Sequence, residues 1–278
     1  MRLPAPAKLN LFLHVTGRRA DGYHTLQTVF QFLDYGDELE ISPREDGLVC
    51  RTQGPASLTA EDDICVKAAH ALQDAAGCRL GADLALDKRL PIGGGLGGGS
   101  SDAATVLLAL NRLWRLDWPL ERLAALGLTL GADVPVFVHG QAAWAEGVGE
   151  ILTPITPPEP WYVVLTPECA VSTSEIFSDP ALKRDAKPAT RADFEAGRLG
   201  NDCLPVVRAR YPMVAEVLDW LGQFGAARLT GTGSSVFAAY HSREEAVAVG
   251  RKLPHGWSHF IARGLNRSPV HAMLARGT

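Results

Sequence analysis

The sequence has no apolar run approaching the roughly 18 to 20 residues that a helix needs to cross a bilayer. An apolar stretch near the start, residues 9–15, contains Asn10 and His14 and follows Lys8. It is too short and too polar for a signal peptide, and it lacks a small-residue cleavage site. We therefore expect a cytoplasmic protein that has no membrane partner.

Long runs of Lys and Arg are also missing, and the formal net charge of the 278 residues is -4. A protein whose main partner is nucleic acid needs a basic footprint, so we expect no nucleic acid partner. The five cysteines are scattered, with neither a C-x-x-C pair nor metal-ligand spacing, which predicts reduced thiols. The remaining composition, 46% apolar and 21% charged, is ordinary for a globular protein and can fill a core.

The length favours two domains, because single domains usually span about 100 to 200 residues. Four prolines fall within residues 153–160 and predict an extended connector. We place the boundary there, which gives domains 1–153 and 154–278. Beyond the connector, the hydrophobic periodicity predicts the order β-α-β-β-α-β, typical of a ferredoxin-like split unit, with one long helix from Pro205 to Phe224 in its first crossover.

In the first half, residues 9–15 alternate between apolar and more polar positions. This pattern predicts a strand whose leucine face enters the core, with Lys8 and Asn10 on the opposite, polar face. A helix is predicted from Asp63, as its N-cap, to a stop at Gly77. Further β-rich stretches are predicted at residues 25–33 and 38–41.

Glycine is concentrated between Gly93 and Gly99, where six of seven residues are glycine. A strand is predicted before this run, at residues 82–87, and a helix that begins near Ser101 is predicted after it. Glycines let backbone N–H groups approach phosphate oxygens, and a helix N-terminus adds free donors and the positive end of a dipole. The pattern therefore predicts a phosphate-binding cradle.

Two familiar phosphate motifs do not fit these residues. Gly93, Gly95 and Gly98 formally match the dinucleotide fingerprint, but the acidic residue at the required distance, Asp117, falls between two helices instead of ending a strand. A Walker A loop needs lysine at the position of Gly99. Phosphate binding remains the prediction without either of those folds.

The loop at residues 91–101 resembles the signature of the GHMP small-molecule kinases, a Pro-x-Gly-x-Gly-Leu-Gly-Ser-Ser-like loop that opens a helix. Within that superfamily, the resemblance is closest to the kinases that act on a cytidine-diphosphate-linked methylerythritol in the non-mevalonate isoprenoid pathway. The stretches that carry this closer resemblance follow one another along nearly the whole chain, at residues 5–10, 19–25, 131–137, 146–150, 201–202 and 229–235.

The resemblance implies an α+β, two-domain GHMP kinase fold, with an N-terminal domain like domain 2 of ribosomal protein S5 and a ferredoxin-like C-terminal domain. It implies ATP-dependent phosphorylation of the 2-hydroxyl of the cytidine-diphosphate-linked methylerythritol. ATP would be the phosphoryl donor with Mg²⁺ as the metal, and the enzyme would be a monomer or a weak homodimer.

The resemblance also assigns site residues. Catalysis falls on Lys8 and Asp133, although Asp133 by its own position predicts the N-cap of a short helix. For the metal, the best candidate hydroxyl is Ser101. Substrate binding falls on Asn10, Tyr23, His24, Phe177, Gly231, Thr232 and Gly233. ATP binding falls on Pro91, Ile92, Gly93, Gly94, Gly95, Leu96, Gly97, Gly98, Gly99, Ser100 and Ser101, with Lys88 and Thr173 bordering the adenine.

Several alternatives stay open from the sequence. Another GHMP kinase, of homoserine or mevalonate type, would share the cradle but not cytidine recognition by Tyr23, His24 and Phe177. A non-catalytic nucleotide or sugar-phosphate sensor on the same fold would not need Lys8 and Asp133. A dinucleotide oxidoreductase would require binding of NAD(P)H. The second glycine turn, residues 231–233, suits substrate diphosphate binding but is equally consistent with a tight hairpin turn.

Overall fold

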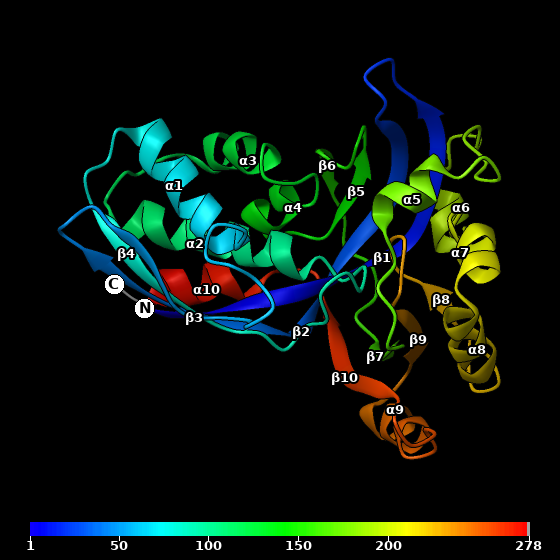
Figure 1. Cartoon of the computed structure of the whole chain (residues 1–278). Coiled ribbons are helices and arrows are strands. Elements are labelled where there is room, and N and C mark those ends of the chain that lie inside the picture. The colour runs from blue at the N-terminus through cyan, green and yellow to red at the C-terminus, as the bar shows by residue number, and fades with distance from the viewer. Residues whose placement is uncertain (277–278) are drawn as a thin grey trace.

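The computed structural model describes residues 1–276, and a sheet runs through both of its lobes (Figure 1). The order of hydrogen-bonded strands is β3-β4-β2-β10-β7-β9-β8, and β1 and β5 also pair with β2, while β6 pairs with β5. The strands are β1 (Arg2–Arg18), β2 (His24–Arg44), β3 (Val49–Gln53), β4 (Gly81–Asp87), β5 (Ala143–Glu146), β6 (Ile151–Pro154), β7 (Trp161–Thr166), β8 (Arg228–Leu229), β9 (Val236–Tyr240) and β10 (Ser258–Leu265).

Helices cover the sheet in both lobes. They are α1 (Ile64–Ala76), α2 (Gly98–Leu113), α3 (Leu120–Leu128), α4 (Val134–His139), α5 (Thr173–Ser178), α6 (Arg191–Glu195), α7 (Leu204–Arg210), α8 (Pro212–Leu221), α9 (Arg243–Gly250) and α10 (Pro269–Arg276). Within residues 1–276, no helix combines the length and the apolar character that crossing a membrane would require.

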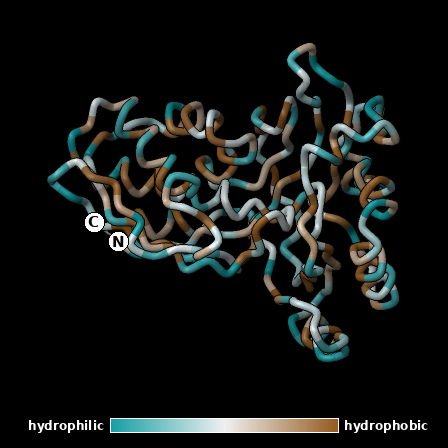
Figure 2. The backbone as a smooth tube through the Cα atoms, viewed as in Figure 1, coloured by the Kyte–Doolittle hydropathy of each residue, from teal (hydrophilic) through white to brown (hydrophobic). Residues whose placement is uncertain are grey.

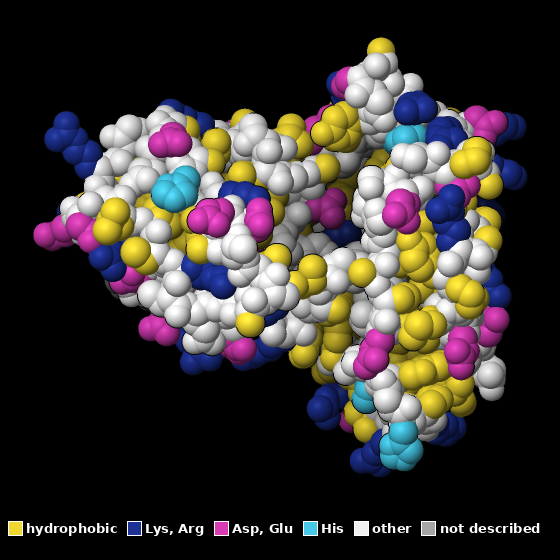
Figure 3. Space-filling view, in the orientation of Figure 1, with side chains coloured by type: hydrophobic (Ala, Val, Ile, Leu, Met, Phe, Trp, Pro, Cys, Tyr) yellow, Lys and Arg dark blue, Asp and Glu magenta, His cyan; other side chains and the backbone are white. Residues whose placement is uncertain are grey.

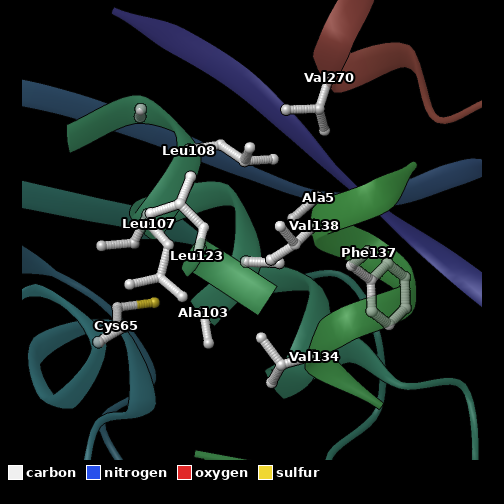
Figure 4. Packing of buried hydrophobic residues seen from close by; sticks show 14 of the residues in the cluster. Ala5, Cys65, Ala103, Leu107, Leu108, Leu123, Val134, Phe137, Val138 and Val270 are labelled. Atoms are coloured by element: carbon white, nitrogen blue, oxygen red, sulfur yellow. The ribbon is translucent and has the colours of Figure 1, made fainter. Parts of the chain in front are cut away.

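The N-terminal lobe packs α1 to α4 against the strands β1, β2 and β4 (Figure 1). Helix α1 begins and ends where the sequence predicts, because Asp63 accepts a hydrogen bond from the Cys65 amide and Gly77 closes the helix in the left-handed conformation. Figure 4 shows how Ala103 and Leu107 of α2 meet Leu123 of α3 in the core of this lobe.

The C-terminal lobe has the predicted split β-α-β-β-α-β order. Strands β7 and β10 pair with each other, and β9 joins β7 to β8, so that the spatial order is β10-β7-β9-β8 with all pairs antiparallel. The long helix predicted from Pro205 to Phe224 is instead two helices, α7 and α8. They break at Tyr211, because the following Pro212 disfavours helical backbone at the residue before it.

Strand β1 extends through the apolar cores of both lobes. As predicted, its leucine face is buried, but the opposite face is buried as well: Lys8 is 3% exposed and Asn10 is 4% exposed. The predicted stretches at residues 25–33 and 38–41 belong to one continuous strand, β2, which pairs with β1 along most of its length. Polar groups on β1 therefore lie inside the protein, between the lobes.

A central apolar cluster joins the two lobes. It contains Leu9 and Phe12 from β1, Leu96 from the glycine-rich loop, and Val164 and Phe237 from the C-terminal strands. Figure 2 shows that hydrophobic residues predominate between the helices and the sheet, while hydrophilic residues predominate on the outer turns. The glycine-rich loop is thus anchored in a core that both lobes share.

The predicted division into domains 1–153 and 154–278 stays a prediction. Helix α10, at the end of the described chain, packs back against β1, and its Val270 belongs to the N-terminal core (Figure 4). The last helix therefore stabilises the first lobe.

We expect Leu107→Ala to lower the free energy of unfolding by about 2 to 5 kcal/mol, because it leaves a cavity where Leu107 is fully buried. Urea denaturation followed by circular dichroism measures the change. Leu128→Ala is the matched control, since Leu128 is 38% exposed and should tolerate truncation. Equal losses in the two variants would contradict this account of the core.

Candidate active site

A cleft of about 830 Å³ lies between the lobes. Its walls come from β1, the start of β2, the glycine-rich loop, the start of α4, helix α5 and the turn after β8. The hollow between the two lobes is visible in Figure 3. This volume is within the range of small-molecule sites.

The cleft gathers nearly all the predicted site residues, which come from distant parts of the chain. Of that set, all of it within the described residues, only Ser101 and Gly233 do not line the cleft. Gly233 follows the lining residues Gly231 and Thr232, whereas Ser101 is fully buried behind its neighbour Ser100. The side-chain oxygen of Ser101 has no hydrogen-bond partner among residues 1–276.

The glycine-rich loop leads directly into α2, which begins at Gly98 and not near Ser101 as predicted. Gly97 is the N-cap in the left-handed conformation, with φ of 70°, and no side chain caps the amides that follow it. Those free N–H groups and the positive end of the α2 dipole therefore face the cleft as donors for an anion.

Lys8 of β1 lies against this loop. Its Nζ donates to the Asn10 Oδ1 at 2.6 Å and to the Gly95 carbonyl at 3.2 Å, and it lies 3.1 Å from the Asp133 Oδ2. The loop closes tightly over the side chain, since a Cβ at Gly97 would approach the Lys8 Cε to 2.9 Å. The lysine side chain is only 4% exposed, so its ammonium is held in one place.

Asp133 occupies the predicted N-cap position of α4, but its side chain makes no capping hydrogen bond. The carboxylate pairs with Lys8 and remains 31% exposed toward the cleft. The carboxylate is therefore not engaged in helix capping and can still accept hydrogen bonds from other groups. Asp133 can accept a hydrogen bond from a bound hydroxyl while Lys8 holds it.

The second glycine turn, between β8 and β9, is tied to the first. Thr230 Oγ1 donates to the Gly95 carbonyl at 3.1 Å, and the Ser235 amide donates to the Gly94 carbonyl at 3.0 Å. Asn201, from the stretch that precedes α7, donates to the Gly231 carbonyl at 2.8 Å and so supports the turn from behind. The two glycine loops therefore form one wall of the cleft.

Three aromatic rings mark the far end of the cleft, where the sequence predicts base recognition. The imidazole of His24 stacks on Phe177, with centroids 5.1 Å apart and planes 24° from parallel. Tyr23, at the β1–β2 turn, is 63% exposed and lines the cleft beside them. An exposed aromatic next to a stacked pair is a suitable surface for a flat base.

Lys88 has an environment that the sequence did not predict. Its Nζ donates to the Asp37 Oδ2 and to the Asp102 Oδ2, both at 2.6 Å. Asp37 also accepts hydrogen bonds from the amides of Arg89 and Leu90, whereas the other oxygen of Asp102 is buried without a partner among residues 1–276. Asp37 carries no motif and is far from Lys88 in sequence, so no local signal could have found it.

The charged groups of this cluster change one another's pKa. Burial raises the pKa of the Asp102 carboxyl, and the nearby Asp37 carboxylate adds to that effect. Burial alone would lower the pKa of Lys88, but the two carboxylates together outweigh burial and hold that pKa above its ordinary value. Lys88 is thus a firmly protonated cation between two acids. The other residue predicted beside the adenine, Thr173, lines the cleft and is hydrogen-bonded to Thr232, with their hydroxyl oxygens 3.0 Å apart.

Comparisons with known proteins identify the family of this chain. The family models described as GHMP kinases N terminal domain and GHMP kinases C terminal match residues 63–141 and 180–259. A 4-diphosphocytidyl-2-C-methyl-D-erythritol kinase of Pseudomonas syringae pv. syringae (strain B728a) is 58% identical over 98% of this chain and 96% of its own length. The chain belongs to the GHMP kinases, in the family of 4-diphosphocytidyl-2-C-methyl-D-erythritol kinases. This confirms the family and fold expected from the sequence.

Solved structures give the same result. A crystal structure of a 4-(cytidine 5'-diphospho)-2C-methyl-D-erythritol kinase is 35% identical, with a TM-score of 0.83 over 95% of this chain and 99% of that chain. The mevalonate kinase of Methanococcus jannaschii is 15% identical with a TM-score of 0.69, over 96% of this chain and 98% of its own, and shows the shared fold alone. The comparisons thus favour the cytidine-type branch over the mevalonate type.

We expect Gly95→Ala to weaken ATP binding by about 5 to 150-fold, the equivalent of the roughly 1 to 3 kcal/mol that a strained backbone costs. Gly95 has φ of +74°, and an added Cβ would lie 2.4 Å from the Thr230 carbonyl oxygen, so the two loops must separate. Isothermal titration calorimetry with ATP measures the effect. Gly200→Ala is the control, because nothing lies within 4 Å of its Cβ position; equal affinity in both variants would contradict the coupling of the loops.

We expect Lys88→Met to lower the free energy of unfolding by about 3 to 5 kcal/mol, because the buried Asp37 carboxylate would lose its cation. Adding Asp37→Asn should recover part of the loss by removing that charge. Urea denaturation at pH 7 measures both variants. Lys67→Met, which removes an exposed lysine 3.7 Å from Asp62, is the control and should change little. No difference between Lys88→Met and the control would contradict the buried triad.

Proposed function

We propose that this chain transfers the γ-phosphoryl group of ATP to the 2-hydroxyl of 4-diphosphocytidyl-2-C-methyl-D-erythritol in the cleft between its lobes. The observation that carries the proposal is the Lys8–Asp133 pair, with its Nζ and Oδ2 atoms 3.1 Å apart, directly beside the glycine-rich loop. A phosphate cradle and a charged pair side by side are the parts that phosphoryl transfer requires.

The ATP phosphates would lie on the amides of residues 93–100 and the N-terminus of α2. Within this wall, Gly94 and Gly95 have their carbonyls tied to the second glycine turn, so the N–H groups are presented on a fixed frame. Gly231 and Thr232 line the same cleft and would bind the diphosphate of the acceptor. The phosphates of ATP and of the acceptor would then bind to two loops that are hydrogen-bonded to each other.

Asp133 would orient the acceptor hydroxyl and receive its proton, while Lys8 stabilises charge on the transferring phosphoryl group. The partial exposure of Asp133 leaves room for the hydroxyl, and the near-complete burial of Lys8 keeps the ammonium fixed during the reaction. Asn10 positions Lys8 through its Oδ1 and is itself held by a 3.0 Å hydrogen bond from its Nδ2 to Thr28. Since phosphoryl transfer depends mainly on position and charge, we assign Asp133 chiefly to positioning.

Mg²⁺ would be held by the ATP phosphates. The predicted Ser101 hydroxyl has no hydrogen-bond partner among the described residues, but it is fully buried and does not line the cleft, so it does not reach a metal bound there. Phosphate oxygens are suitable ligands for this hard cation. When bound, Mg²⁺ would supply positive charge that neutralises the phosphates. Among residues 1–276, no group of three or more acidic, His or Cys side chains is arranged to hold a metal by itself.

At the other end of the cleft, Tyr23 and Phe177 would hold the cytosine ring by stacking, and His24 would bind its edge. Lys88 and Thr173 would border the adenine. A cytoplasmic location, and a state that is monomeric or weakly dimeric, remain predictions.

We expect Asp133→Asn to lower kcat by about 10² to 10⁴-fold, because the neutral amide neither receives the proton nor holds the hydroxyl as strongly. ATP binding should stay close to that of the unaltered chain, since Asp133 lies outside the glycine cradle. Steady-state kinetics with the cytidine substrate, and calorimetry with ATP, measure the two quantities.

Asp219→Asn is the matched control, because Asp219 pairs with Arg208 on an exposed surface of α8. It should leave kcat unchanged. Turnover by Asp133→Asn at the rate of the control would refute the assigned site, while phosphorylation of mevalonate or homoserine in preference to the cytidine substrate would refute the assigned acceptor.

A further inference from the structure

Arg184 is the residue that joins the two base-binding elements, although no motif contains it. It lies in the segment that follows α5, and its Nε donates to the His24 Nε2 at 2.9 Å. Its Nη2 donates to the carbonyls of Phe177 at 2.9 Å and Asp179 at 2.7 Å, at the end of α5. Its Nη1 donates to the Leu182 carbonyl at 2.9 Å. One guanidinium therefore links the start of β2 to α5.

The contact between Arg184 and His24 determines where the imidazole carries its proton. A guanidinium is always protonated and has only donors, so the ring nitrogen that it approaches must be an acceptor. His24 Nε2 is therefore unprotonated, and the neutral ring carries its hydrogen on Nδ1. Among the described residues, no protein group hydrogen-bonds Nδ1, and His24 lines the cleft.

We propose that Arg184 is a positioning residue that fixes His24 in the Nδ1–H tautomer, so that the cleft presents a hydrogen-bond donor to an acceptor atom on the edge of a pyrimidine base. This inference rests on the proposed function and deepens it. A cytosine edge offers such acceptors at its ring nitrogen and carbonyl oxygen. Without Arg184, the ring would be free to present a bare nitrogen, which repels those same atoms.

The orientation of the ring follows from the same contacts. His24 stacks on Phe177, and Arg184 holds both the imidazole of His24 and the carbonyl of Phe177, so the ring and its stacking partner are fixed together. A binding site that is ordered in advance loses less entropy when the ligand arrives.

The charge of Arg184 also keeps His24 neutral. Burial lowers the pKa of His24 below its ordinary value of 6.5, and the cations of Arg184 and of Arg18, at the end of β1, lower it further. A lowered pKa means that the neutral ring persists as the pH falls toward 6.5 and is lost only below that value. Protonation would place a second N–H on Nε2, facing the donor of Arg184, so the contact that orients the ring would be lost although Nδ1–H remains. The KM for the cytidine substrate should therefore be constant above pH 6.5 and rise at more acidic pH.

The first experiment reads the tautomer directly in the full chain, without ligand, at pH 7.5. Nitrogen-15 NMR of histidine-labelled protein should show a pyridine-type Nε2 and a pyrrole-type Nδ1 for His24, with the signals assigned by their loss in His24→Gln. In Arg184→Met the ring should lose this fixed pattern. A pyrrole-type Nε2 in the unaltered chain would overturn the inference.

The second experiment compares Arg184→Met and Arg184→Lys in steady-state kinetics. Arg184→Met should raise the KM for the cytidine substrate about 10 to 100-fold, the effect of losing one to two directed hydrogen bonds. The KM for ATP should stay unchanged. The KM for the cytidine substrate should no longer rise at acidic pH, because protonation of the freed ring always leaves an N–H on Nδ1 and so restores the donor. Arg184→Lys restores a cation and a donor, so its KM should fall between those of Arg184→Met and the unaltered chain.

Arg208→Met is the matched control, since it removes an exposed arginine that pairs with Asp219. A merely structural role for Arg184 would lower kcat and the melting temperature without changing the pH profile of KM, and that result would overturn the inference. If Arg184→Met does not fold, Arg184→Lys supplies the comparison. The NMR measurement needs no substrate, so a lack of turnover by the unaltered chain would contradict the proposed function alone.

Discussion

The burial of the Lys8 ammonium is the constraint on which the rest of the site depends. A charge removed from water is costly unless oxygens surround it. Here the oxygens come from Asn10 on the same strand, Gly95 in the glycine-rich loop and Asp133 at the start of α4. All three elements must be in place at once, so satisfying one cation positions β1, the phosphate loop and the acidic residue together.

Two other cations also connect separate elements of the fold through the oxygens and nitrogens that they contact. Lys88 links β2 to α2 through Asp37 and Asp102, and Arg184 links β2 to α5. Lys88 is paired with two acids, so its cluster contains one more acid than base. Arg184 donates hydrogen bonds to backbone carbonyls. In the function we propose, attraction of the ATP phosphates would therefore rest mainly on the uncapped amides and dipole of α2 and on Lys8, since Lys88 is already neutralised by its acids.

Hydrogen bonds between the two glycine loops hold them in a fixed arrangement, which matters for catalysis. The carbonyls of Gly94 and Gly95 bond to Ser235 and Thr230, and Leu96 is buried in the apolar cluster that both lobes share. The sites that we propose for the donor and acceptor phosphates thus belong to one packed unit. A reaction that depends on placing a hydroxyl in line with a phosphoryl group benefits from such a rigid frame.

The sequence predicted the features that depend on near neighbours. The caps of α1 at Asp63 and Gly77, and the order of the C-terminal strands, follow from local hydrogen bonding and periodicity. Where tertiary contacts outweigh local preference, prediction failed: α2 begins at Gly98 although glycine is a poor helix former, because the loop is anchored at Leu96 and closes over Lys8. The burial of the polar face of β1 was missed for the same reason.

By itself, the sequence determined the family and the residue types available for chemistry, and it predicted phosphate binding at the glycine-rich loop. Only the tertiary structure decided that Asp133 pairs with Lys8 without capping its helix, that Asp37 and Asp102 share Lys88, and that Arg184 reaches His24. These contacts join residues far apart in the chain, and the hydrogen-bonding capacity of a side chain does not indicate which distant partner will meet it.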